Sequence, residues 1–223
     1  MTINRWALAT AAAAAVVVTA PASGQSASAT IEKAIAAWGR INTFSGTFEQ
    51  SLQNPLLHKT SIAHGEFRQQ RPNKLAIRFT DPAGDAIISD GTWLWIYLKQ
   101  AAPGQVIKRP ASDRSEVPID ISQLLDAAAA RFDAVAEGSE PVGTRAARRI
   151  GLTPKAGTHA SFTHATVWVD DADGLVRQFE VTEPSGLVRR ITLTRVAINP
   201  AIDPSEFRFV VPQGVKIVSG ERQ

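Results

Sequence analysis

The side chains in this sequence that could do chemistry are few, and their spacing does not favour catalysis. His159 and His164 stand five residues apart around a predicted strand start, which is a poor spacing for two metal ligands on one face. The segment Asp170-Asp171-Ala172-Asp173-Gly174 resembles a calcium loop, but Val169 occupies the first ligand position and no glutamate closes the loop. We therefore expect a hairpin turn at this segment, and neither a metal site nor a cofactor.

Two arginine pairs, Arg148-Arg149 and Arg189-Arg190, each place one guanidinium on each face of a predicted strand. Arginine can bind phosphates, but the aromatic residues of a nucleic-acid platform are missing around both pairs. We favour the interpretation that these arginines occupy solvated positions on the strands. The chain also lacks a glycine-rich phosphate loop, a His-Glu-x-x-His motif and a Gly-x-Ser-x-Gly motif. No pair of acid, base or nucleophile stands out, so an enzyme is the least favoured class.

The amino-acid composition excludes further classes of protein and of site. The 223 residues, 44% of them hydrophobic, suit one domain with a full-sized core. The absence of cysteine excludes a disulfide framework, a thiolate metal site, a cysteine nucleophile and an N-terminal lipidated cysteine. The net charge of +3 is too small to require nucleic acid or an anionic membrane as a partner.

The first residues predict a signal peptide. Arg5 precedes an uncharged run, Ala7–Ala20, and small residues at Ala20-Pro21-Ala22 and Ala27-Ser28-Ala29 give two cleavage signals. The run of 14 residues is shorter than the roughly 20 that a membrane-spanning helix needs. We expect a signal peptide at residues 1–24, cleaved between 22 and 29, and one mature domain at residues 25–223. The mature protein is expected in the periplasm, without a lipid anchor.

Hydrophobic periodicity predicts two helices and a large sheet. Apolar residues recur every three or four positions over Ile31–Ile41 and over Ile121–Phe132, where Asp120 and Gln123 can form a capping box. Elsewhere a period of two predicts ten or eleven antiparallel strands in one curved sheet. The strands are expected at Phe44–Leu52, Ile62–Arg68, Lys74–Phe79, Asp85–Ser89, Thr92–Leu98, Gln105–Arg109, Phe132–Glu137, Thr144–Leu152, Phe162–Asp170, Leu175–Glu183 and Leu187–Ala197. The strand at Thr92–Leu98 is apolar on both faces, so both must be covered.

One face of this sheet collects a surplus of large apolar side chains. The residues expected on the concave face are Phe48, Phe67, Leu75, Ile77, Phe79, Ile87, Phe179, Ile191 and Leu193. They could form a packed core beneath the two helices, which is the simpler interpretation. They could also line a cavity for an apolar ligand, with the helices as a movable lid. Periodicity does not choose between the two.

Several short motifs follow one another in a specific order along the chain. They are Phe44-Ser-Gly-Thr-Phe-Glu-Gln50, Gly65-Glu-Phe-Arg-Gln-Gln-Arg71-Pro72-Asn73, Ser89-Asp-Gly-Thr-Trp-Leu-Trp-Ile-Tyr97, Val167-Trp-Val-Asp170 and Phe207-Arg-Phe209 with Pro212-Gln-Gly-Val215. This ordered set, from about Ile31 to Val218, resembles the family of outer-membrane lipoprotein carrier proteins, LolA.

The resemblance implies a mostly β fold, a single half-open (unclosed) antiparallel β-barrel of about 11 strands covered by amphipathic helices. The nine concave-face residues would then line an acyl-chain cavity, and the lid helices would contribute Ile35, Trp38, Leu124, Leu125 and Phe132. Arg71, in the family's Arg-Pro motif, would hydrogen-bond lid residues in the closed, empty form and release them when acyl chains enter. The implied protein is a monomeric chaperone that takes acylated lipoproteins from an inner-membrane ATP-driven releasing complex to an outer-membrane receptor.

Other classes are weighed against this carrier. The outer-membrane receptor shares the implied fold but needs a lipobox cysteine, and the chain has none. A periplasmic stress sensor would need a further regulatory domain, and only five residues follow Val218. A periplasmic carrier of another lipid or acylated small molecule stays open, because an acyl pocket does not identify the headgroup.

Overall fold

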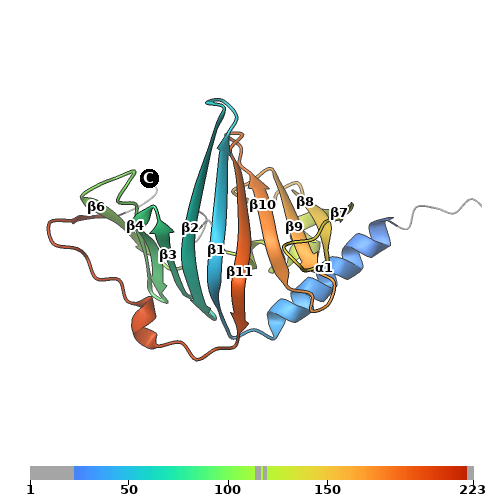
Figure 1. The fold of residues 1–223 in the computed structure, drawn as a ribbon, viewed down its shortest axis with the longest axis horizontal. Coiled ribbons are helices and arrows are strands. Elements are labelled where there is room, and N and C mark those ends of the chain that lie inside the picture. The colour runs from blue at the N-terminus through green and yellow to red at the C-terminus, as the bar shows by residue number, and fades with distance from the viewer. Residues whose placement is uncertain (1–22, 114–116, 118–119, 220–223) are drawn as a thin grey trace, which may run out of the picture.

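The chain forms one twelve-stranded sheet with its α-helices at the concave side, as seen in a computed structural model that describes residues 23–113, 117 and 120–219 (Figure 1). The predicted signal peptide lies outside the described residues except for Ser23 and Gly24. The helices are α1 (Ser23–Gly39), α2 (Ser122–Leu125), α3 (Ala128–Arg131) and the 3-10 helix η1 (Pro204–Phe207). The strands are β1 (Thr43–Asn54), β2 (Lys59–Gln70), β3 (Lys74–Asp81), β4 (Ala83–Asp90), β5 (Trp93–Tyr97), β6 (Gln105–Pro110), β7 (Phe132–Ser139), β8 (Ala147–Pro154), β9 (His164–Asp170), β10 (Val176–Thr182), β11 (Val188–Ile198) and β12 (Lys216–Ser219).

The strand order β12-β6-β5-β4-β3-β2-β1-β11-β10-β9-β8-β7 confirms a single unclosed sheet. Strands β1 to β6 run outward from the centre, the chain then crosses to the far edge at β7, and β7 to β11 return to pair with β1. All eleven predicted strands are present, and their pairings are antiparallel. The sequence did not predict the twelfth strand, β12, which pairs parallel with β6 at one edge of the sheet.

The two predicted helices differ from expectation in length and continuity. Helix α1 starts at Ser23, well before Ile31, and so contains the second predicted cleavage signal, whose Ala27 is buried in the core. The predicted helix over Ile121–Phe132 is two four-residue helices, because Ala127 between them has a left-handed backbone with φ 53°. Phe132 therefore begins strand β7 and is not a lid-helix residue. Among the described residues, no helix is long and apolar enough to cross a membrane.

The segment after β11 covers the convex face of the sheet next to β3, β4 and β5. Phe209 stacks on Trp95 with ring centroids 5.6 Å apart, and Phe207 is buried in a small apolar cluster with Ala76 and Ile88. Glu206 accepts a hydrogen bond from the Arg78 guanidinium at 3.2 Å. This packing supplies the second cover that the doubly apolar strand β5 requires.

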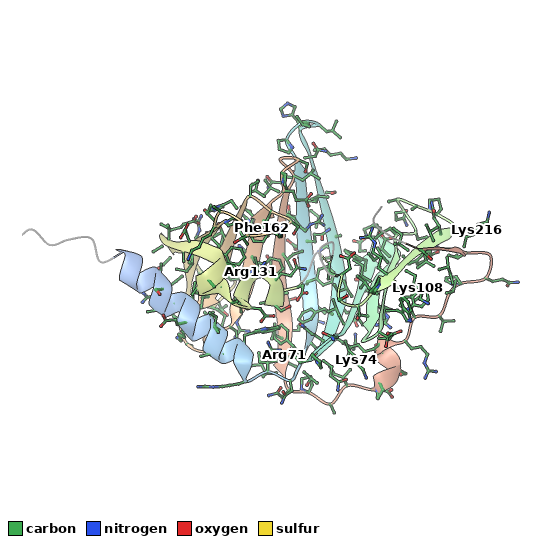
Figure 2. All side chains as sticks on the ribbon, turned by 180° about the vertical axis from the view of Figure 1, so that it is seen from behind. Arg71, Lys74, Lys108, Arg131, Phe162 and Lys216 are labelled. Atoms are coloured by element: carbon green, nitrogen blue, oxygen red, sulfur yellow. The ribbon has the colours of Figure 1, made fainter. Side chains whose placement is uncertain are left out.

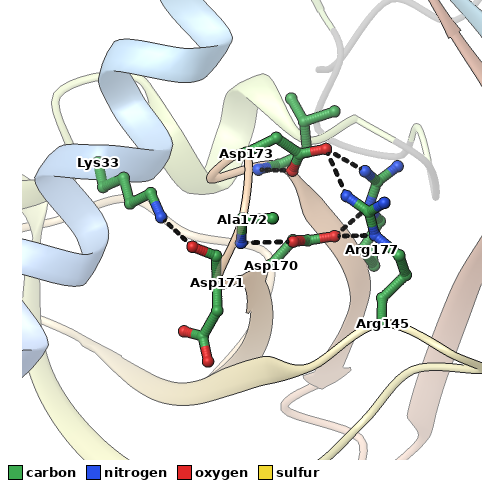
Figure 3. Close-up of polar contacts among 8 residues, drawn as sticks. Lys33, Arg145, Asp170, Asp171, Ala172, Asp173 and Arg177 are labelled. Carbon is green, nitrogen blue, oxygen red and sulfur yellow. Dashed lines mark hydrogen bonds and ion pairs between the residues drawn. The ribbon is translucent and has the colours of Figure 1, made fainter.

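The β9–β10 turn fixes helix α1 to the sheet (Figure 3). The Lys33 ammonium of α1 donates to the backbone carbonyl of Asp171 in this turn. Gly174, with φ 76°, lies so close to Lys33 that an added Cβ would come within 3.1 Å of the Lys33 carbonyl oxygen. The predicted hairpin turn is thus also the docking point of the helix.

Asp170 organises this turn with two arginines. Its carboxylate accepts hydrogen bonds from Arg145 and from Arg177, the latter at 3.0 Å, and its side chain is 2% exposed. Burial alone raises the pKa of Asp170, but the hydrogen bonds from Arg145, the Ala172 amide and Arg177 outweigh it and lower the pKa from 3.8 to about 2. The ionised carboxylate therefore stabilises the folded state at neutral pH.

We predict that Asp170→Asn lowers the free energy of unfolding by about 2 kcal/mol at neutral pH, because the lowered pKa corresponds to stabilisation of that size. The contribution is complete above the unfolded-state pKa of 3.8 and disappears as the pH falls toward about 2. Urea unfolding measured across this pH range tests it. The control is Asp171→Asn, whose exposed ion pair with Arg148 should contribute less than about 1 kcal/mol. Equal losses for both variants, or a pH-independent loss, would contradict the prediction.

Candidate functional site

The concave face of the sheet is one continuous apolar surface. All nine residues expected there belong to a single hydrophobic cluster, eight of them buried and Phe79 partly buried. They come from both halves of the sheet, from β1 to β4 on one side and from β10 and β11 on the other. The sequence prediction of which strand residues share this face therefore agrees with the structure.

Two glycines allow the largest rings to lie flat across this face. Phe48 of β1 is paired with Gly65 of β2, and Gly46 of β1 is paired with Phe67 of β2. A Cβ at Gly65 would lie 2.5 Å from the Phe48 ring and 2.4 Å from the Arg78 carbonyl oxygen. Each phenylalanine ring thus occupies the space that the opposite residue leaves empty.

Helix α1 and the lid segment, which we define as residues 120–131 with α2 and α3, cover the concave face. Trp38 of α1 and Leu124 and Leu125 of the lid segment are buried in the same cluster as the sheet residues, and Ile35 packs against it partly buried. Phe132 also belongs to this cluster, but it reaches it from strand β7. Four of the five residues predicted for the lid helices therefore lie on the covering helices.

Arg71 lies where α1, the lid segment and the sheet meet (Figure 2). Its Nη1 donates to the Trp38 carbonyl oxygen at 3.4 Å, and its guanidinium lies 5.3 Å from the centre of the Trp38 ring. Its Nη2 is 3.7 Å from the Asp126 carboxylate in the lid segment. One side chain thus contacts the end of α1 and the lid segment together.

The cover leaves hollows over the sheet, and two of them are lined by residues expected on the concave face. One, of about 350 Å³, is lined mostly by apolar residues of β2 to β5, including Ala63, Phe79 and Ile87. The other, of about 270 Å³, lies between the lid segment and β10, where Leu124 and Phe179 line it. The face is therefore neither a completely packed core nor one open cavity.

Arg189 lines both hollows and corrects the expectation for the arginine pairs. Its guanidinium donates to Gln50 and to Glu183, each at 3.1 Å, and its side chain is 21% exposed. Its neighbour Arg190 is exposed and paired with Glu180, as a solvated strand position should be. The alternation of strand faces could have placed Arg189 beside Ile191, but the sequence did not indicate its two partners.

The other polar residues singled out in the sequence hold the sheet together. Arg148 pairs with Asp171, and Arg149 pairs with Glu137. Asp120 accepts a hydrogen bond from the Ser122 amide at 3.2 Å, directly before α2. Within residues 23–113, 117 and 120–219, no group of three or more His, Asp or Glu side chains could hold a metal ion.

The comparison with protein families identifies this architecture. The family model described as outer membrane lipoprotein carrier protein LolA matches residues 39–210. The chain belongs to the LolA family. This match spans both halves of the sheet, Arg71 and the lid segment.

Individual LolA relatives are similar over most of their length. The outer-membrane lipoprotein carrier protein of Halorhodospira halophila is 28% identical over 181 residues, which are 81% of each chain. That of Salmonella paratyphi B is 27% identical over 180 residues, 80% of this chain and 82% of the relative.

Solved structures share the fold at lower identity. An uncharacterized conserved protein from Thermus thermophilus superposes with a TM-score of 0.55 at 12% identity, over 87% of this chain and 99% of the other. MucB superposes with a TM-score of 0.52 at 20% identity, over 83% of this chain and 63% of MucB.

We predict that Gly65→Ala lowers the free energy of unfolding by at least about 2 kcal/mol, because the added methyl group would overlap the Phe48 ring and a backbone oxygen. Urea unfolding monitored by circular dichroism measures the loss. Gly39→Ala is the matched control, since nothing lies within 4 Å of an added Cβ at the end of α1. A Gly65→Ala protein as stable as the Gly39→Ala protein would show that the concave face is not packed as described.

Proposed function

We propose that this protein is a periplasmic carrier that holds the acyl chains of lipoproteins on its concave face. The observation that carries the proposal is a continuous apolar face with two hollows, closed by a short lid segment and one arginine. Acyl chains cannot cross an aqueous compartment without a penalty of about 0.8 kcal/mol for each exposed methylene. The names of the relatives and the predicted signal peptide support lipoproteins as the cargo and the periplasm as the compartment.

Arg71 serves in this proposal as the latch of the lid segment. Its side chain is 32% exposed and that of Asp126 is 61% exposed, so their ion pair contributes less than about 1 kcal/mol. The 3.4 Å hydrogen bond to the Trp38 carbonyl is also long. Burying two or three methylenes of an acyl chain would offset both contacts, and so the latch opens to cargo without preventing release.

The lid segment is suited to move. Helices α2 and α3 have four residues each, far below the length at which a helix is stable alone, so packing on the concave face holds them in place. Among the described residues, the buried Trp38 indole nitrogen has no hydrogen-bond acceptor, and an unpaired buried donor is unfavourable. An acyl chain that displaces the lid segment therefore replaces an imperfect cover.

The carrier would work between two membrane partners. We infer that it receives cargo from an inner-membrane ATP-driven lipoprotein-releasing complex and delivers it to an outer-membrane lipoprotein receptor, acting as a monomer and without enzymatic activity. The energy difference between the closed, empty form and the open, loaded form sets the affinity for cargo. A modest difference permits transfer to a receptor.

We predict that the protein, exported and purified from the periplasm, extracts an acylated lipoprotein from inner-membrane vesicles that contain the releasing complex and ATP. The same lipoprotein with its acylated cysteine replaced by serine is the control and should not bind. Equal binding of both forms would contradict the proposal. If lipids other than lipoproteins co-purify and compete fully for the concave face, a carrier of another lipid is the correct function.

We predict that Arg71→Leu reduces transfer of bound lipoprotein to the receptor about fivefold, because loss of about 1 kcal/mol from the closed form favours the open, loaded form. Transfer is measured with radiolabelled lipoprotein and receptor in detergent-free buffer. Arg190→Leu is the control, since it removes the same charge from an exposed ion pair with Glu180. Unchanged transfer by Arg71→Leu would remove the latch role.

A further inference from the structure

The hairpin between β1 and β2 carries two exposed leucines at its tip. Leu56 is 83% exposed and Leu57 is 69% exposed, and Leu56 is the most exposed large hydrophobic side chain among the described residues. Figure 1 shows this hairpin projecting beyond the neighbouring β10–β11 turn and the rest of the sheet. Adjacent exposed leucines at the farthest point of a hairpin are unusual on a protein surface that contacts only water.

The tip is held in a defined turn. The Asn54 side-chain oxygen accepts a hydrogen bond from the Leu57 amide at 3.1 Å. The His58 amide donates to the Pro55 carbonyl at 3.4 Å, and His58 has a left-handed backbone with φ 48°. The turn therefore presents both leucines outward instead of folding them back on the strands.

The charged residue of the tip itself is a cation. Lys59 follows the leucines closely, and no acidic residue occurs from Gln50 to Gly65. Leucines flanked by a cation match the interface of a bilayer with anionic lipids, where apolar side chains enter the acyl region and lysine contacts the headgroups. A narrow convex tip also fits a soft, flat surface without a preformed pocket.

The tip leads directly to the larger hollow. Ser61, Ile62 and Ala63, which follow it on β2, line the 350 Å³ hollow, and Ile62 is 50% exposed. A bilayer that holds the tip would thus lie next to this hollow.

We propose that the tip, Leu56 and Leu57 with Lys59, docks the protein on a lipid bilayer by inserting the two leucines among the acyl chains. This docking is a direct contact with lipid and goes beyond the proposed carrier function. It needs no lipoprotein and no protein partner, so its test is independent of cargo binding.

The test measures binding of the full chain, purified from the periplasm, to vesicles of phosphatidylethanolamine with phosphatidylglycerol and to vesicles of phosphatidylcholine alone. We expect binding to both, tighter to the anionic vesicles, and a loss of at least about tenfold for Leu56→Ser with Leu57→Ser. The control is Ile198→Ser with Val210→Ser, which removes two exposed apolar side chains away from the tip and should bind like the unaltered protein. Equal affinity of the two double variants would overturn the proposal.

The absence of cysteine permits a second, site-specific readout. A polarity-sensitive fluorophore attached to Leu57→Cys should become brighter and blue-shifted on these vesicles, and the same fluorophore on Val210→Cys should not change. A silent label at position 57 would overturn insertion. A label that responds only when membrane proteins are present would identify a protein as the partner of the tip. That result would also overturn the proposal of direct insertion into lipid.

Discussion

The rest of this structure depends on one constraint, a curved sheet that does not close on itself. Its concave face carries Phe48, Phe67, Ile77 and other large apolar side chains that water would otherwise contact. A closed barrel would bury such residues inside, but the edges of this sheet are β7 and β12. The face must therefore be covered by something that is not a strand, and α1 with the lid segment provides that cover.

The two covering elements are held by different kinds of contact. Helix α1 is fixed at the β9–β10 turn, where Lys33 contacts the Asp171 carbonyl and the nearby Asp170 is buried with two arginines. The lid segment is attached by the partly exposed contacts of Arg71, by the packing of Leu124 and Leu125, and by Lys155, which donates to the Ala129 carbonyl oxygen at 2.8 Å. In the proposed carrier the lid segment is the part that opens, because its two helices have four residues each, whereas α1 has 17 residues and docks on a turn that contains a buried ionised group.

The sequence predicted the elements whose burial follows a simple period. Alternation placed all nine concave-face residues correctly, since half-buried strands repeat every two residues. It missed the break at Ala127, because a left-handed backbone at alanine leaves no trace in an apolar stripe. It missed β12 because its four residues are exposed and so carry no burial pattern. The partners of Arg189 and Asp170 lie on other strands, and only the strand pairing brings them together.

The packing quality of the cover sets how much free energy a ligand of the concave face must supply to displace it. A perfectly packed lid would give the closed form several kcal/mol, and an apolar ligand would have to exceed that gain before binding. Here the indole nitrogen of Trp38 has no acceptor among the described residues, Ala127 has a left-handed backbone, and two hollows lie beneath the cover. Each defect reduces the free energy that opening costs.

The polar bridge of Arg189, Gln50 and Glu183 lies between the two hollows. It limits how far an apolar chain can spread without leaving charged groups unpaired. In the proposed carrier, the low opening cost and the polar bridge together would keep the affinity for an acyl chain moderate, as reversible loading requires.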